Sequence, residues 1–193
     1  MKTMTTRITL ISSGATAATR NATFPADEPL EQQESVKAAA LIPALPSVDR
    51  TFCSPDRASR QTAEALGLAA IAEPDWREVD FGRWAGKSLA AIQEEDPAAL
   101  AAWIHDPDSS PPDGESVAGL IRRIGRWLDL QFALPGRLLI IAPPNCLRAA
   151  VVHSLQAPAA SFRHIDVMPL TVTYLSGRQG QWRLRLGGRS RAD

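Results

Sequence analysis

The stretch LISSGATAATR, from Leu10 to Arg20, is where the chain passes from a strand into a loop. The residues before it, RITLI from Arg7 to Ile11, are β-branched and apolar, which is typical of a buried strand. Ser12, Ser13 and Gly14 then end that strand. In a largely parallel sheet, the functional site lies beyond the carboxyl ends of the strands. We therefore expect the loop from Ser12 to Arg20 to line a site.

Strand and helix patterns alternate along the rest of the chain. The apolar run RLLIIA, from Arg137 to Ala142, is typical of a central strand of a parallel sheet. The helical apolar period is clearest from Glu115 to Leu130. Further strands are predicted at 50–53, 170–175 and 182–186, and further helices at 30–41, 54–66, 97–104 and 146–155. This alternation predicts an α/β three-layer sandwich with a mainly parallel central sheet and helices on both faces.

Two boundary predictions are more specific. Ser54 and Pro55 are expected at the N-cap and first position of the helix at 54–66. Gly177 and Gly180 are expected in the turn between the last two strands, and the tail after Leu186 is expected to be loose.

Composition excludes several classes of function. The 193 residues suit one domain, 1–193, and the formal net charge of +0 gives no reason to expect nucleic acid or a membrane as partner. We find no apolar stretch of the ~20 residues that a membrane span needs and no signal peptide, so we expect a cytoplasmic protein. Cys53 and Cys146 lack metal-ligand spacing, and we expect neither a metal nor a cofactor.

Seven segments in order resemble the histidine phosphatase superfamily, also called phosphoglycerate mutase-like, and within it the small branch similar to α-ribazole phosphatase. LISSGAT stands where that family has a strand followed by Arg-His-Gly. The other segments are FPADEPLEQQ, CSPDRASRQTAEALGL, WREVDFGRWAGKSLAAI, PPDGESVAGLIRRIGRWL, LLIIAPPNCLRAA and IDVMPLTVTYL. The resemblance implies a phosphoglycerate mutase-like fold with a helical insertion at about 87–130 over the site.

What the resemblance implies for activity is phosphoryl transfer through a histidine. In that family a neutral imidazole attacks the phosphoryl group and forms a phosphohistidine. Two arginines and a second histidine hold the phosphoryl oxygens, which carry the charge. A carboxylic acid protonates the leaving oxygen.

The chain departs from this pattern at four positions. Ser13 stands where the resemblance places the nucleophilic histidine, and Ser12 where it places the adjoining arginine. Ala58 stands at the second arginine. Pro143 stands at the second histidine, and proline offers neither a ring nitrogen nor a backbone N–H. Glu78, in REVDFG, is the one residue of the chemical set that is kept, as the candidate acid.

Other residues leave alternatives open. His105 lies in the predicted insertion and could reach over the site. Ser13 could act as a nucleophile only with a base beside it, which the sequence does not place. Glu78 could equally make a structural hydrogen bond, and the arginines could be surface residues. The residues predicted to bind an anion are Ser12, Ser13, Gly14, Thr16, Arg20, Arg57 and Asn145, and Arg148 is a further candidate for supplying positive charge.

Two hypotheses of function follow. The first is a pseudo-phosphatase, without phosphohistidine catalysis, that binds a small anionic or phosphorylated ligand or a protein partner. The second is an active phosphomonoesterase with a rebuilt site around Glu78 and nearby arginines. The sequence leaves the ligand and a possible homodimer open.

Overall fold

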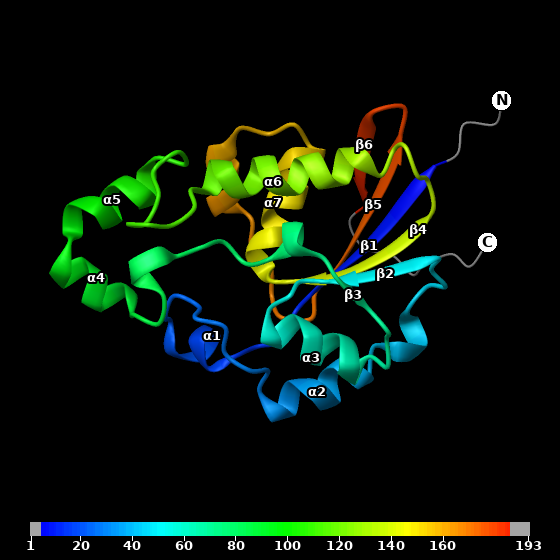
Figure 1. Ribbon diagram of the computed structural model, residues 1–193, viewed down its shortest axis with the longest axis horizontal. Coiled ribbons are helices and arrows are strands. Elements are labelled where there is room, and N and C mark those ends of the chain that lie inside the picture. Colours follow the sequence, from blue (N-terminus) through cyan, green and yellow to red (C-terminus); the bar gives the residue numbers. More distant parts are fainter. Residues whose placement is uncertain (1–4, 186–193) are drawn as a thin grey trace.

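A six-stranded sheet forms the centre of the computed structural model, which describes residues 5–185 (Figure 1). The strand order is β3-β2-β4-β1-β5-β6. The strands are β1 (Thr6–Ser12), β2 (Arg50–Cys53), β3 (Ile71–Ala72), β4 (Arg137–Ala142), β5 (Val172–Arg178) and β6 (Gln181–Arg185). The first four are parallel to one another, whereas β5 pairs antiparallel with β1 and β6 antiparallel with β5. The predicted α/β fold is therefore confirmed, with a mixed sheet.

The register of the parallel strands brings three loops to one edge of the sheet. Ser12 of β1 lies opposite Ala142 of β4, and Cys53 of β2 lies opposite Ile141. β1 and β4 occupy the middle of the sheet because their apolar side chains are buried on both faces. The loops that follow β1, β2 and β4 consequently start side by side.

Helices cover both faces of the sheet. Helices α6 (Val117–Leu130) and α7 (Pro144–Ser154) pack on one face, and α2 (Gln32–Ala39) and α3 (Arg57–Ala65) on the other (Figure 1). Successive residues of β4 alternate between the two layers: Leu138 and Ile140 face the α6–α7 side, whereas Leu139 and Ile141 face the α2–α3 side. The result is the predicted three-layer sandwich.

The remaining helices are short. They are α1 (Ala17–Asn21), α4 (Leu89–Glu95) and α5 (Pro97–His105), with the 3-10 helices Ile42–Ala44, Pro74–Trp76, Gly82–Trp84 and Ala159–His164. Helices α4 and α5 extend away from the sheet at the left of Figure 1, and Ile92 and Leu100 anchor them to the main apolar core. The predicted insertion at about 87–130 covers α4, α5 and α6. Of these, α6 packs against α7 in the helical layer on the sheet.

Three boundary predictions need correction. Helix α3 begins at Arg57 with Asp56 at the N-cap, because the backbone N–H of Ser54 still pairs with Ile141 of β4. Gly177 belongs to β5, and the turn is made by Gln179 and Gly180, both at positive φ. Helix α7 starts at Pro144 instead of 146. The predicted loose tail lies outside the described residues.

None of the helices formed by residues 5–185 combines the length and the apolar character needed to cross a membrane.

Candidate functional site

A cleft of about 340 Å³ opens at the carboxyl ends of β1, β2 and β4. Its walls come from the loop after β1, the start of α3, the segment 77–81 and the start of α7. Ser13, Ala58, Pro143 and Glu78 all line it, although up to 130 positions separate them along the chain. The structure thus brings together four of the five residues at the positions that the resemblance singled out.

Ser12, the fifth of these residues, does not line the cleft. Its Oγ donates to the carbonyl oxygen of Met168 at 2.7 Å and accepts from the backbone N–H of Thr171 at 2.9 Å. The side chain is fully buried in these contacts. Ser12 therefore joins the end of β1 to the segment before β5, and its prediction as a ligand contact is wrong in this structure.

The predicted anion-binding residues other than Ser12 do not all reach the cleft. Asn145 is not among its lining residues, although its Nδ2 donates to Glu78 Oε1. Gly14 and Thr16 line the cleft with Ser13. Arg20 and Arg57 do not: Arg20 forms an exposed ion pair with Glu31, and Arg57 is exposed outside the cleft. Arg20 lies within α1 and Arg57 is the first residue of α3, and both side chains are exposed, so neither supplies the charge expected for an anion in the cleft.

Gly14 is needed where the loop after β1 passes α2. A Cβ there would lie 2.5 Å from Leu30 Cδ1 and 2.9 Å from Glu34 Cβ. Its N–H donates to Thr62 Oγ1 at 3.1 Å. This glycine therefore sets how closely the loop packs against α2 and α3.

Among the charged residues that line the cleft, acidic ones outnumber basic ones. Arg77 is the one basic residue among the lining residues, all of which lie in the described part of the chain. The acidic lining residues are Asp27, Glu28, Asp56, Glu78 and Asp80. Sequence reasoning missed Asp56, although aspartate is as good an N-cap as serine and Ser-Pro-Asp offered both.

Glu78 and Asp56 form a close pair of acids. The backbone N–H of Glu78 donates to Asp56 Oδ2 at 3.1 Å, and Glu78 Oε1 accepts from Val79 N at 2.8 Å and from Asn145 Nδ2 at 3.1 Å. Burial, with the negative charge of Asp56, raises the pKa of Glu78 to about 7. Burial also raises the pKa of Asp56. Glu78 therefore holds a proton over much of the neutral pH range and can donate it.

Helices α6 and α7 position the segment that carries Glu78. Arg123 of α6 donates through Nη1 to the carbonyl oxygens of Asp75 at 2.6 Å and Arg77 at 3.1 Å. Cys146 of α7 donates through Sγ to the carbonyl oxygens of Trp76 and Arg77. Cys146 is buried, and burial raises its pKa, so it is a structural thiol.

None of the three histidines of the chain lines the cleft. His105 ends α5, His153 contacts Asp129 at 3.0 Å, and His164 ends a 3-10 helix. Ser13 consequently has no imidazole beside it to act as a base. Among residues 5–185, no three histidine, cysteine or acidic side chains gather closely enough to hold a metal ion.

Curated relatives match only parts of the chain. A bifunctional protein of Mycobacterium tuberculosis is 39% identical over 67 residues, which are 35% of this chain and 18% of that protein. A probable phosphoglycerate mutase of Erwinia tasmaniensis is 24% identical over 129 residues, 65% of this chain and 60% of the mutase. The chain thus spans less than two thirds of the length of either relative.

Solved structures match nearly the whole chain. An α-ribazole phosphatase from Shigella flexneri superposes with a TM-score of 0.84 at 24% identity, covering 93% of this chain and 95% of that one. A mycobacterial glucosyl-3-phosphoglycerate phosphatase superposes with a TM-score of 0.80 at 23% identity, covering 96% and 100%. At such identities these likenesses establish the fold. The family model described as histidine phosphatase superfamily (branch 1) matches residues 8–188, and the chain belongs to that superfamily.

Proposed function

We propose that the protein is a pseudo-phosphatase, which binds a ligand or a protein partner without forming a phosphohistidine. The observation that carries this proposal is the convergence of Ser13, Ala58 and Pro143 with Glu78 on one cleft. Segments that did not correspond to those of the family would not bring these four positions to one cleft. Their meeting supports the correspondence, in which serine, alanine and proline stand where two histidines and an arginine are expected.

The charge of the cleft supports the same proposal. Phosphoryl transfer depends on fixed cations around the equatorial oxygens. Apart from Glu78, which is about half protonated at neutral pH, four acidic residues and one arginine line this cleft, so its field opposes a phosphate dianion. Among the ligands that the sequence leaves open, this field favours a neutral or cationic group, such as a basic side chain of a partner protein, over a phosphorylated molecule.

The alternative, an active phosphomonoesterase, draws support from Glu78 alone. A carboxyl group with a pKa of about 7 suits a general acid at neutral pH. The arginines that this alternative requires, Arg20 and Arg57, lie outside the cleft. The first hypothesis therefore accounts for more of the geometry.

Hydrolysis of p-nitrophenyl phosphate between pH 4 and 9 tests the proposal. We expect no turnover above that of the Glu78→Gln variant. The control is Glu95→Gln, which removes an exposed carboxylate that pairs with Lys87 and does not line the cleft. Turnover that Glu78→Gln abolishes and Glu95→Gln retains would establish the phosphomonoesterase instead.

Restoring the family residues tests the correspondence of positions. We expect Ser13→His, Ala58→Arg and Pro143→His together to produce measurable turnover or a phosphorylated histidine detectable by mass spectrometry. Adding Ser12→Arg completes the set, but it also removes the buried hydrogen bonds of Ser12, so the triple variant is the cleaner test. Folded variants with neither turnover nor label would contradict the correspondence.

A further inference from the structure

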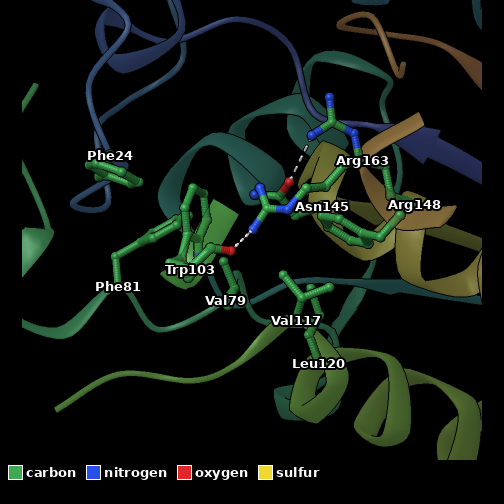
Figure 2. A pocket seen from close by; sticks show the side chains of 10 residues that line it. Phe24, Val79, Phe81, Trp103, Val117, Leu120, Asn145, Arg148 and Arg163 are labelled. Carbon is green, nitrogen blue, oxygen red and sulfur yellow. Dashed lines mark hydrogen bonds between the residues drawn. The ribbon is translucent and has the colours of Figure 1, made fainter. Parts of the chain in front are cut away.

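A second cavity, of about 280 Å³, lies beside the cleft (Figure 2). Val79 and Phe81 line both hollows, and Asn145, which donates to Glu78, stands between them. The second cavity is walled by α5, α6, α7 and the 3-10 helix Ala159–His164. Its volume is at the lower end of the ~300–1,000 Å³ usual for ligand sites, which suits one ring or a short chain.

One side of this cavity is apolar. Phe24, Phe81 and Trp103 pack with ring centres 5.0–6.4 Å apart and lie on the left of Figure 2. Val117 and Leu120 of α6 close the bottom of the view. A ligand in the cavity would therefore place an apolar body against this wall.

Two arginines enter from the opposite side. The Arg163 guanidinium lies 4.2 Å from the centre of the Trp103 ring and donates to the carbonyl oxygen of Trp103. Arg148 donates through Nη1 to Asn145 Oδ1 at 3.2 Å. Burial and the positive charge of Arg148 together lower the pKa of Arg163.

These two positive charges are poorly compensated. Asp166 approaches Arg148 only to 3.6 Å, and its side chain is 83% exposed, so solvent screens the pair. Arg163 has no carboxylate partner within residues 5–185. None of the lining residues, all of them in the described part of the chain, is acidic.

Two buried donors at the cavity also lack acceptors among the described residues. They are Nε1 of Trp103 and Nε of Arg148, and both residues line the cavity. A buried N–H without an acceptor costs free energy, and a native structure usually supplies one. The cavity thus offers the guanidinium groups of Arg148 and Arg163 beside a wall of apolar side chains.

We propose that this cavity binds a small organic carboxylate with an aromatic or short acyl body. The carboxylate lies between Arg148 and Arg163, where it accepts from their guanidinium groups. The apolar body packs against Phe24, Phe81 and Leu120. This inference rests on the proposed binding role and adds a ligand in a second cavity, and it uses none of the positions at which the family's histidines and arginines are replaced.

Calorimetric titration of the full chain with phenylacetate tests the proposal. We expect saturable one-to-one binding, weakened at least about tenfold by Arg163→Gln and by Arg148→Gln, because each removes a charge-assisted hydrogen bond. Arg122→Gln is the matched control: it removes an exposed arginine of α6, paired with Asp108, and should leave the affinity unchanged. Having two cavity variants keeps the test valid if one of them does not fold.

Two further probes separate the charge from the apolar body. Benzyl alcohol has the ring without the charge, and inorganic phosphate has the charge without the ring; we expect both to bind at least about tenfold more weakly than phenylacetate. The indole N–H signal of Trp103, assigned with Trp103→Phe, should shift on titration with phenylacetate. Absence of binding, equal binding of benzyl alcohol, or unchanged affinity of folded Arg163→Gln and Arg148→Gln would overturn the inference. Turnover of p-nitrophenyl phosphate would contradict the proposed function and leave this inference standing.

Discussion

Glu78 is a carboxyl group that folding moves from solvent into a partly buried place beside a second acid, Asp56. Its Oε1 accepts two hydrogen bonds, which favour the charged form, yet burial outweighs them and raises the pKa to about 7. The folded protein therefore binds a proton at Glu78 more tightly than the unfolded chain does. This difference makes the stability of the protein depend on pH.

Replacing Glu78 by glutamine is expected to change that dependence. Between pH about 4.5 and 7 the folded state binds more protons at this group, so the wild-type free energy of unfolding falls as the pH rises. Glutamine stays neutral and keeps an oxygen for Val79 and Asn145. We therefore compare the free energy of unfolding of the variant with that of the wild type at two pH values. The variant's value, relative to that of the wild type, should be higher at pH 8 than at pH 4.5 by up to about 3 kcal/mol. Urea unfolding at both pH values measures this gain.

Glu95→Gln serves as the comparison for this titration, because Glu95 is half exposed and does not line the cleft. Its difference from wild type should be nearly the same at both pH values. An equally flat result for Glu78→Gln would show that the pKa of Glu78 is not raised.

Helix α6 carries an arginine on its apolar face. Arg123 lies three residues after Leu120 and one before Ile124, and it is as buried as they are. Its guanidinium pairs with Glu115 at 2.6 Å and holds the carbonyl oxygens of the segment before Glu78. The sequence predicted the helix, but a buried cation within its stripe could be assigned only after the partner segment was in place.

Arg123→Met is therefore expected to destabilise the protein by about 3 kcal/mol or more, since it leaves Glu115 partly buried without its partner. The measurement is urea unfolding at neutral pH. Arg122→Met, at the neighbouring exposed position, should change stability by no more than about 0.5 kcal/mol. Equal effects of the two substitutions would show that the buried ion pair of Arg123 with Glu115 does not stabilise the protein.

At the scale of the whole molecule, the apolar clusters on the two faces of the sheet share side chains from the same strands, β1 and β4. Cys53 is buried in the apolar cluster on the α2–α3 side, and Cys146 in the cluster on the α6–α7 side. Burial raises the pKa of both thiols. Because β1 and β4 contribute side chains to both clusters, we expect the two layers to lose their packing together.

We accordingly expect neither thiol to react with Ellman's reagent in the native protein within minutes, and both to become reactive over one range of urea concentration. Cys53→Ser and Cys146→Ser identify which thiol reacts. Release of one thiol at a clearly lower urea concentration would show that the two layers unfold separately.

The net charge of the chain does not show that acidic and basic residues gather at different sites. The formal net charge is +0, yet five acidic residues and one arginine line the cleft, and the neighbouring cavity carries two arginines and no acid among its described lining residues. We predicted an anion site beside Ser13. The structure instead offers the positive charge one cavity away, from Arg148 and Arg163.

The fold could be predicted from the sequence because periodicity is local. The apolar runs at Leu10 and Ile140 and the stripe of α6 each specify an element within a few turns or residues, and their order specifies the sandwich. The place of the cleft followed too, since loops after parallel strands meet at one edge. Ser13, Ala58, Pro143 and Glu78 were predicted to meet there, and they do.

What each side chain does at that edge was decided by tertiary packing. Ser12 turns to Met168, Arg20 and Arg57 turn to solvent, and Asp56 turns to Glu78, all through contacts that no local pattern encodes. A loop residue's direction depends on which distant segment supplies its hydrogen-bond partner. Likewise a carboxylate's pKa or an arginine's lack of a partner depends on burial and on neighbours far along the chain. The sequence therefore determined the sheet and the location of its site, whereas only the tertiary structure determined the charge of that site.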